Sequence, residues 1–498
     1  MIGGAGMKRE RQRVVNILVL LITLSFVTAC GKDPEFDINE EPFSLSIMSI
    51  THSGEPLPPD SLVKKKIEEY TNTKIDFIWV PNSTYEDKLN ITLASRELPT
   101  IITVDKKRAS IIQATRAGLF WELESYLKEY PNLSQADPIV LQNTAIDGKI
   151  YGVYRSRPIG RNGITYRKDW AENLRLGEIK TIEDFYQMLK AFTYEDPDGN
   201  GKMDTYGLAM SKYSGPWDIM STWFGAPNQW GEDSKGRLVP AHKTNEYREA
   251  LQFFRALYEE NLVTQDFAVL DSSMWMEDVK KGQAGVVVDV LDHAQRLQEE
   301  SNQNQRGSQY DVIGAVEGPK GLRNLHTSGY LGFHAITKSG AKTEGELKKT
   351  LRFLDQLNDR EMQIILNNGI EDRHFKVVDG YAIPYGDDPQ LLKETKDINQ
   401  LHMGIPGDLF YVVKDSPIRD KIQMMIEENK KIVINNPAEG LTSDIWSQKG
   451  KGLDDILDNA RVRYIMGQMN EDELEQAYGL WEQAGGLELI EELNQLYK

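Results

Sequence analysis

The 498-residue chain is strongly acidic, with 76 Asp and Glu residues against 58 Lys and Arg residues and a formal net charge of −18 at pH 7. Such a charge keeps a protein soluble and argues against nucleic acid as a partner. The length predicts two lobes, each able to bury its own core. The only cysteine is Cys30, which excludes a disulfide or a cysteine-built metal site within one molecule.

The N-terminus has the organisation of a secretory signal peptide. Four basic side chains between residues 8 and 13 precede an apolar run over residues 14–27, which is short for a membrane span. The run ends in Val27-Thr28-Ala29 directly before Cys30 and resembles a bacterial lipobox. We predict a signal peptide over 1–29, a lipid (palmitate) on Cys30 as the only membrane anchor, and a polar tether over 30–41. Met7 is an alternative start, and an ordinary signal peptide is the alternative reading.

After the tether, short apolar strands alternate with helices. Strands are expected over 43–48, 74–80 and 100–104, and helices over 62–70 and 85–95. This alternation predicts an α/β fold with a mostly parallel sheet covered on both faces. Ligands of open sheets bind outside the carboxyl ends of the strands. The candidate ligand edge therefore holds His52, Asn82 and Asp105.

An acidic loop over residues 196–204 has the spacing of a cation site. Calcium is bound by several oxygens around a glycine bend, including one backbone carbonyl. Five positions match the start of an EF-hand loop, with Gly201 at the bend: Asp196, Asp198, Asn200, Lys202 by its carbonyl, and Asp204. The final bidentate glutamate is absent, because Gly207 stands there. We therefore predict structural calcium in a loop that is no true EF-hand, with a metal-free Asp/Asn/Gly turn as the alternative.

The order of the segments resembles a known family, the extracellular solute-binding lipoproteins of carbohydrate ABC importers, in particular their large calcium-bearing type. The resemblance covers nearly the whole secreted chain. Each block is weak by itself, but their order and spacing are specific: residues 118–123, 147–153, 163–170, 181–185, 196–208, 281–286, 329–336, 351–355, 369–375 and 445–450. The family usually has Glu after the last loop aspartate, whereas Thr205 stands here, which puts the strength of the site in doubt.

The resemblance implies a two-lobed periplasmic-binding-protein-like fold of type II, with lobes joined by crossing hinge strands. On that basis the N-lobe covers 42–156 plus 330–385, and the C-lobe covers 157–329 plus 386–498. The ligand would lie in the cleft between the lobes. Trp275 and Trp446 fall in stretches that line the cleft in the family.

Sugar recognition needs flat apolar faces for the ring C–H groups and polar groups for the hydroxyls. Three tryptophans lie in a stretch rich in glycine and proline, where we expect one or two to be stacking platforms and the others to be core: Trp217, Trp223 and Trp230. Trp79, Trp121 and Trp481 fall in strand or helix patterns and are predicted to be structural.

A basic cluster crowds the predicted crossover between the lobes: Arg155, Arg157, Arg161, Arg167 and Lys168. It could bind the carboxylates of a charged sugar, since arginine forks match carboxylates; a solvated loop paired with acids elsewhere is the alternative. Arg155, Tyr166 and Arg167 are taken as candidate ligand residues from this region. A neutral plant-type oligosaccharide is the first expectation.

Catalytic motifs are missing: the sequence has no G-x-S-x-G, H-E-x-x-H, P-loop or CxxC pattern. We therefore expect that the protein is not an enzyme. We expect a monomeric binding protein at the extracytoplasmic face of a bacterial membrane. It would present an oligosaccharide to ABC permease subunits that work with a separate ATPase. The alternatives are a calcium-dependent cell-surface carbohydrate-degrading enzyme and a binding protein for peptides or lipid head groups.

Overall fold

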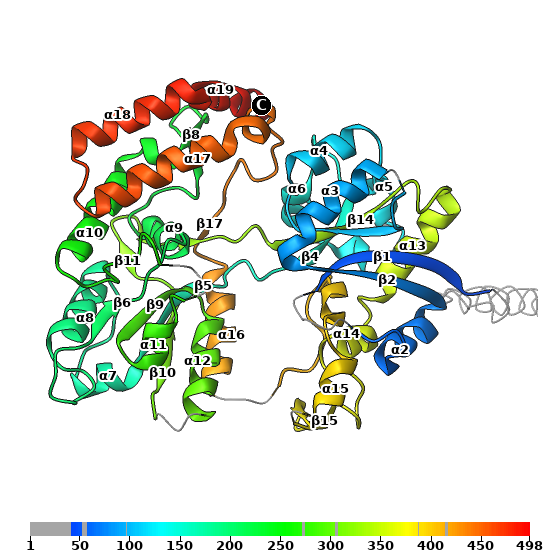
Figure 1. The fold of residues 1–498 in the computed structure, drawn as a ribbon, viewed down its shortest axis with the longest axis horizontal. Helices are drawn as coiled ribbons and strands as arrows, with labels where there is room; N and C mark the ends of the chain where they lie inside the picture. Colours follow the sequence, from blue (N-terminus) through cyan, green and yellow to red (C-terminus); the bar gives the residue numbers. More distant parts are fainter. Residues whose placement is uncertain are drawn as a thin grey trace, which may run out of the picture. The chain divides into compact units, whose positions relative to one another are not determined.

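Figure 1 shows the computed structural model of the protein, which describes residues 41–51, 57–95, 97–270, 274–303, 307–386, 388–413 and 417–498. The predicted signal peptide, Cys30, nearly all of the tether and His52 lie outside the described residues. Residues 1–43 and 44–498 form separate units. Within the described ranges, no helix combines the length and the apolar character needed to cross a membrane.

Five strands form the first sheet, in the order β2-β1-β3-β14-β4. They are β1 (Phe43–Thr51), β2 (Thr73–Pro81), β3 (Ile101–Val104), β4 (Gly152–Ser156) and β14 (Tyr330–Ile336). All four side chains of β3 are buried, as expected for a central strand covered on both faces. The strands and helices predicted between residues 43 and 104 are confirmed, with small differences at their ends.

Helices and a hairpin accompany the first sheet. Its helices are α2 (Leu62–Thr71), α3 (Tyr85–Ser95), α4 (Ala109–Arg116), α5 (Glu124–Leu127), α6 (Pro138–Thr144), α13 (Glu344–Gln356), α14 (Arg360–Asn367) and α15 (Pro389–Glu394). Short 3₁₀ turns are η1 (Asn82–Thr84), η2 (Leu133–Gln135) and η4 (Ile398–Leu401), and the hairpin is β15 (Phe375–Val378) with β16 (Tyr381–Pro384). Side-chain caps begin several helices, such as Ser61 at α2 and Thr343 at α13, each worth about 1 kcal/mol.

Four strands form the second sheet, in the order β10-β5-β9-β6. They are β5 (Asn162–Arg167), β6 (Tyr206–Leu208), β9 (Ala284–Val290) and β10 (Tyr310–Ile313). Its helices are α7 (Lys168–Asn173), α8 (Ile182–Tyr194), α9 (Gly215–Trp223), α10 (Asn245–Glu259), α11 (Glu277–Lys281), α12 (Asp292–Gln303), α16 (Pro417–Asn429), α17 (Asp444–Ile465), α18 (Glu471–Trp481) and α19 (Leu487–Leu496).

Small strand pairs and turns complete this second group of elements. The pairs are β7 (Trp230–Glu232) with β8 (Leu238–Pro240), β11 (Glu317–Gly318) with β12 (Gly321–Leu322), and β13 (Asn324–Leu325) with β17 (Val433–Ile434). A 3₁₀ turn, η3 (Ala241–Lys243), precedes α10, and a π-turn, η5 (Glu482–Gly486), joins α18 to α19. The helices α17, α18 and α19 lie together at the C-terminal end of the chain (Figure 1).

Both sheets are mixed. β1 pairs with β3 and β6 with β9 in parallel, whereas β14 is antiparallel to β3 and β4, and β5 is antiparallel to β9 and β10. Because β3 and β4 are both antiparallel to β14, they run in the same direction as β1, and β9, β10 and β6 likewise share a direction against β5. The predicted mostly parallel sheet is therefore confirmed, with one reversed strand in each sheet. The reversal arises because β5 and β14 are each reached by a direct connection from the other group of elements, and so run against their neighbours.

Residues 388–413 contact the first group of elements. The Thr51 hydroxyl donates to Asp397 at 2.6 Å, and the Ser156 amide donates to the Met403 carbonyl at 2.7 Å. The Ile405 amide donates to the Asn358 side chain at 2.9 Å. This segment adds no strand to either sheet and is held by long-range contacts. The predicted N-lobe boundary at residue 385 stays a prediction.

Four buried asparagines hold the connections between the two groups of strands. Asn162 donates to the Leu325 carbonyl, and Asn324 to the carbonyls of Asn162 and Gly314. Asn429 donates to the carbonyls of Gly160 and Asn162 at 2.8 and 2.9 Å. Asn228 donates to the carbonyls of His326 and Ile434. These side-chain amides replace the backbone hydrogen bonds that irregular connections lack.

Candidate functional site

Three adjoining cavities lie along elements of the second group, and one of them, the amide cavity, is also lined by residues of α6 from the first group. The aromatic cavity has a volume of about 300 Å³, the amide cavity about 570 Å³ and the arginine cavity about 420 Å³. The aromatic and amide cavities share Asn228, Gln229 and Leu325, and the amide and arginine cavities share Leu325, His326 and Thr327. Each cavity has a volume that small-molecule ligands occupy, and the shared residues join them into one extended site.

Four tryptophans line the aromatic cavity, from elements far apart in the sequence: Trp217 on α9, Trp230 on β7, Trp446 on α17 and Trp481 on α18. Trp217, Trp230 and Trp481 are almost fully buried, whereas Trp446 is 45% exposed. The Trp446 ring lies over Gly450, where an added Cβ would come within 2.8 Å of the indole. A glycine one helical turn away therefore lets this exposed ring lie along α17.

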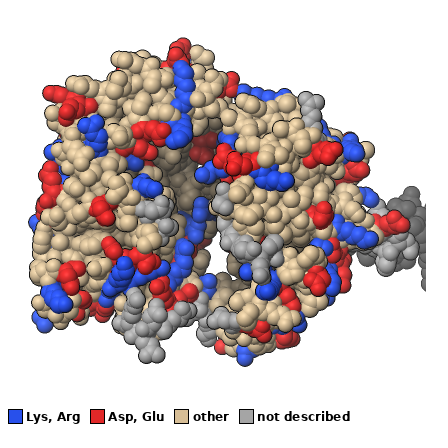
Figure 2. All heavy atoms as spheres, viewed as in Figure 1, with Lys and Arg blue, Asp and Glu red and all other residues tan. Residues whose placement is uncertain are grey.

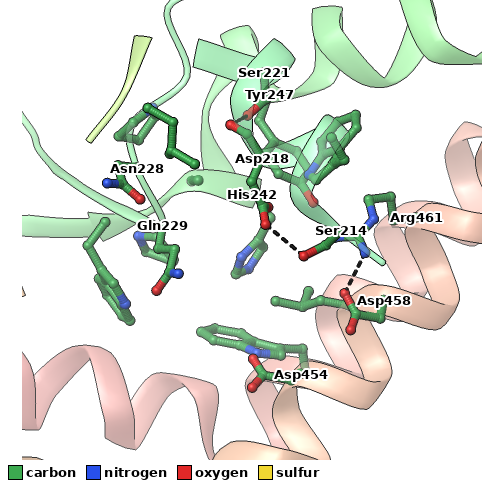
Figure 3. A pocket seen from close by; sticks show the side chains of 18 of the residues that line it. Ser214, Asp218, Ser221, Asn228, Gln229, His242, Tyr247, Asp454, Asp458 and Arg461 are labelled. Carbon is green, nitrogen blue, oxygen red and sulfur yellow. Dashed lines mark hydrogen bonds and ion pairs between the residues drawn. The ribbon is translucent and has the colours of Figure 1, made fainter. Parts of the chain in front are cut away.

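Polar groups face the same cavity (Figure 3). Asn228 and Gln229 lie on one side, Arg461 and Asp458 on the other, and Asp218, His242 and Asp454 in the middle. The Asp218 carboxylate accepts a hydrogen bond from Ser214 at 2.7 Å, and Arg461 forms an ion pair with Asp458 at 2.8 Å. The cavity therefore offers hydrogen-bonding groups beside aromatic faces.

Burial and neighbouring charges shift the pKa values of these groups. Burial raises the pKa of Asp218, against the charge of Arg461 and the Ser214 hydrogen bond. Asp454 as a residue is exposed, but partial burial of its carboxyl, with the neighbouring Asp458 and Asp455 charges, raises its pKa to about 6. Burial also lowers the pKa of His242 to about 3, so the imidazole is neutral at pH 7. Its ring packs 4.5 Å from the ring of Trp481.

The amide cavity is lined mainly by uncharged polar groups. Six amide side chains contribute: Gln142, Asn143, Asn228, Gln229, Asn435 and Asn436. The Asn228 amide is occupied by backbone carbonyls, and Asn143 donates to the Ser328 carbonyl at 3.0 Å. Gln142, Gln229 and Asn435 are exposed. Amides donate and accept, which suits a ligand that carries many hydroxyl groups.

The arginine cavity contains Arg157, Arg161 and Arg296 with the ring of Tyr213. Tyr213 is 44% exposed and its ring packs edge-on to Trp275 at 5.9 Å. Gly215 permits this position, because a Cβ there would lie 2.3 Å from the Tyr213 ring. Burial and Asp289 raise the pKa of Tyr213 to about 12, so its hydroxyl remains protonated at pH 7.

The predicted calcium loop follows α8 and precedes β6. Asp196, Gly199 and Gly201 adopt positive φ angles, which allows the tight bend. The Asn200 side-chain amide donates to Asp198 at 2.8 Å and to Asp204 at 3.2 Å, and the backbone amides of Asn200 and Gly201 donate to Asp196. In the described part of the chain, no three His, Cys, Asp or Glu side chains come together as a metal site requires.

The nitrogen end of the Asn200 side chain therefore points toward the acids. A bound cation would require the oxygen end at this place. The two ends of an asparagine amide are nearly equal in shape, so a half-turn of this group would supply an oxygen ligand instead. The half-turn would also remove the hydrogen bond that the Asn200 oxygen accepts from the Lys202 backbone amide at 2.8 Å. The Thr205 hydroxyl, at the position of the usual glutamate, is buried and donates to the Phe192 carbonyl at 2.8 Å. The remaining oxygens of the loop fit a calcium ion in type.

Several predicted ligand residues lie elsewhere. Trp223 is fully buried in the core of the second group, and its ring packs against Phe185, so a stacking role for it is wrong. Arg167 forms an ion pair with Asp169, and its guanidinium lies 4.5 Å over the centre of the Trp170 ring. These contacts give Arg167 a structural role. Trp275 is buried in a separate core cluster.

Three further candidates line none of the three cavities. Arg155 is buried and donates to the Leu331 carbonyl and the Gln400 side chain. Tyr166 lies 3.4 Å from Asp311, and Asp105 pairs with Arg108. By contrast, Trp217, Trp230 and Trp446 come together in the aromatic cavity, although their contact with a ligand stays a prediction.

Sequence reasoning missed Gln229, His242, Asp454 and Tyr213, and it treated Trp481 as structural only. Gln229 and Tyr213 belong to the same stretch rich in glycine and proline as the predicted tryptophans, so a wider reading of that stretch would have found them. His242, Asp454 and Trp481 lie in ordinary helical or turn patterns. Nothing local marks them, because only the packing of α17 and α18 brings them to the cavity.

Comparison with known proteins identifies the family to which this chain belongs. The family model for the bacterial extracellular solute-binding protein matches residues 55–358. Lipoprotein LipO of Bacillus subtilis is 43% identical over 465 residues, covering 91% of this chain and 92% of LipO. The chain belongs to the bacterial extracellular solute-binding proteins.

Other members of this solute-binding family extend the comparison. The polygalacturonan/rhamnogalacturonan-binding protein YtcQ of Bacillus subtilis is 33% identical over 97% of this chain and 98% of its own. The substrate-binding protein FusA of Streptococcus pneumoniae, solved with kestose and as an EF-hand mutant with fructo-nystose, shares the fold with a TM-score of 0.65. It is 18% identical, with 91% of this chain and 98% of FusA covered. The family and these relatives are binding proteins, and the two-lobed α/β fold of type II is confirmed.

Proposed function

We propose that this solute-binding protein captures an oligosaccharide in the aromatic and amide cavities and delivers it to the permease of an ABC importer. The observation that carries the proposal is the aromatic cavity, where Trp217, Trp230, Trp446 and Trp481 surround polar groups. Its neighbour, the amide cavity, continues the site with uncharged donors and acceptors. The printed names of YtcQ and FusA, a polygalacturonan-binding protein and a fructooligosaccharide-transport protein, support this class of ligand.

The geometry suits a sugar chain for two physical reasons. Sugar rings carry an apolar C–H face, which stacks on an indole such as the exposed Trp446. Their hydroxyl groups need both donors and acceptors, which the exposed amides of Gln142, Gln229 and Asn435 provide. The asparagine-held connections between the two groups of strands would act as the hinge when the protein closes on its ligand.

The family and the N-terminal sequence support a proposal for location and partners. We propose that the protein is anchored by a lipid on Cys30 at the extracytoplasmic face of the membrane and works as a monomer. LipO is itself named a lipoprotein, which supports the anchor. The permease and its ATPase would be separate chains, since the sequence has no P-loop motif.

A thermal-shift screen with oligosaccharides tests the proposal. We expect one class to raise the melting temperature of the purified protein, because a ligand that binds only the native state stabilises it. Replacing the exposed Trp446 with Ala should weaken binding of that sugar by about five- to tenfold, as expected for loss of about 1 kcal/mol of stacking. Tyr385→Ala removes an aromatic ring that is 46% exposed outside these cavities, and should leave affinity unchanged. Equal losses in both variants would contradict the stacking role.

We further propose that the acidic loop holds a structural calcium ion. Asp196, Asp198, Asn200, Asp204 and the Lys202 carbonyl would be the ligands. Calcium at about a hundred times its Kd would add about 2.7 kcal/mol of stability. A chelator should then lower the melting temperature by a few degrees without unfolding the protein at room temperature.

Loop variants separate calcium removal from other effects of the chelator. The Asp204→Asn variant should melt at the temperature at which the unaltered protein melts in the presence of chelator. Neither chelator nor added calcium should change the melting temperature of this variant. Asp233→Asn, in an acidic turn where Asp233 pairs with Arg237, should respond like the unaltered protein. A melting temperature that does not move with chelator would refute the calcium site.

A carbohydrate-degrading enzyme is the competing function. One observation bears on it, namely that Asp454 in the aromatic cavity has a pKa raised to about 6, as a general acid requires. We propose that the protein nevertheless performs no chemistry, since the family and relatives are binding proteins. Chromatography of a bound oligosaccharide after long incubation should return it at its original length, and shortened products would overturn this proposal.

A further inference from the structure

The basic residues of the cluster over residues 155–168 differ in the groups that they contact. Arg161 forms an ion pair with Asp292, Arg167 with Asp169, and Lys168 with Glu172 at 3.7 Å. Arg155 is held inside by a carbonyl and an amide oxygen. Arg157 differs from all of these, because among the described residues its side chain has neither a hydrogen bond nor an ion pair.

Arg157 follows β4, on the connection from the first sheet to the second. Its backbone amide donates to the Gly329 carbonyl at 2.9 Å, which ties this residue to the returning connection before β14. The side chain is half-buried and lines the arginine cavity, and its buried Nε has no partner in the described part of the chain. Burial, followed by the charge of Arg161, lowers the pKa of Arg157.

The acids of the arginine cavity are already engaged by other groups. Asp289 lies 3.0 Å from the Nε2 atom of His293, and Asp218 accepts the Ser214 hydroxyl. Asp292, which lies outside the cavity lining, pairs with Arg161. Asp289 and Asp292 act on Arg157 through their charge, but neither forms an ion pair with it. In a protein of net charge −18, a half-buried guanidinium without an ion pair among the described residues is unusual, since unpaired charges are costly to withdraw from water.

The rest of the cavity suits a sugar ring. The Tyr213 ring offers an exposed aromatic face, and Thr327 and His326 link the space to the amide cavity. Basic side chains lie along the hollow in the middle of the face that Figure 2 shows. A chain bound in the amide cavity could therefore place its next unit beside Arg157.

We propose that the arginine cavity is a subsite for a hexuronic-acid unit, whose carboxylate the Arg157 guanidinium binds. This inference rests on the proposed function and names the substrate class as acidic oligosaccharides. A planar carboxylate accepts two parallel N–H bonds from an arginine fork, which gives both strength and orientation. It would supply the partner that Arg157 lacks, and it replaces the neutral oligosaccharide as the expected ligand.

The test compares a galacturonic-acid oligomer with its methyl ester, which keeps the sugar chain and removes the charge. Isothermal titration calorimetry should show that the unaltered protein binds the free acid at least tenfold more tightly than the ester. Arg157→Gln should lose most of this preference, chiefly through weaker binding of the free acid, and Arg157→Lys should keep part of it, because the charge remains without the fork. Arg175→Gln removes one exposed charge outside the cavities and should keep the full preference.

The outcomes distinguish this inference from the proposed function. If the protein binds neutral oligosaccharides, or acid and ester equally, the sugar-binding function stands and the uronic-acid subsite is wrong. A preference for the acid that persists in Arg157→Gln also overturns the assignment to Arg157. If no oligosaccharide binds, both proposals fail. Circular dichroism of each variant checks that it is folded, so a lost preference is read only from proteins that still bind the ester.

Discussion

Replacing Arg461 with Met should lower the free energy of unfolding by about 3 kcal/mol at pH 7, because it removes the cation that compensates Asp218 beside the aromatic cavity. Burial acts to lower the pKa of Arg461, but Tyr247, Asp458 and Asp218 more than offset it, so the guanidinium stays charged. It also lies 5.6 Å from the Trp217 ring centre. Urea denaturation of both proteins measures the loss.

The loss should depend on pH in a defined direction. The pKa of Asp218 is raised in the folded protein, so the native state binds this proton more tightly than the unfolded state, and stability falls as pH rises above the ordinary aspartate value of about 4. Without Arg461, which lowers this pKa, the penalty above about pH 4 increases. The difference between the two proteins should therefore be small at pH 4 and full at pH 7.

Two variants control for this result. Arg461→Lys keeps a charge and should recover part of the stability. Asp458→Asn removes the more exposed partner of Arg461 and should cost less than 1 kcal/mol. A loss in Arg461→Met that does not change between pH 4 and pH 7 would show that packing, and not the charge of Asp218, is responsible.

Replacing Asn429 with Ala should lower the free energy of unfolding by about 2–3 kcal/mol, since it leaves the Gly160 carbonyl without its buried donor and opens a small cavity. Asn429 is 1% exposed, at the end of α16. The Asn162 carbonyl keeps the Asn324 amide as a donor, which limits the loss. Thermal and urea unfolding give the magnitude.

A second substitution tests whether the donor group matters. Asn429→Asp keeps the shape but presents oxygens to two carbonyls, so it should destabilise the protein at least as much as Ala. Asn459→Ala, on the exposed face of α17, should change stability by less than about 0.5 kcal/mol. If Asn429→Asp is as stable as the unaltered protein, the asparagine contacts do not hold these connections.

Local patterns predicted much of the architecture. The strands and helices between residues 43 and 104 were identified because apolar periodicity reports directly which side of an element is buried. The bend of the acidic loop at Gly199 and Gly201 follows from glycine and aspartate in sequence. The family resemblance supplied the two-lobed fold, which the comparisons confirm.

Patterns of neighbouring residues therefore suffice for the strands and helices between residues 43 and 104 and for the family, because periodicity and motif order can be read along the chain. The availability of each aromatic and charged side chain depends instead on packing between distant segments. Trp223 and Trp446 look alike in sequence, yet one is fully buried and the other 45% exposed. Arg157 and Arg161 differ only in that Asp292, more than a hundred residues away, reaches one of them. Burial and pairing are set by long-range contacts, which no local pattern records.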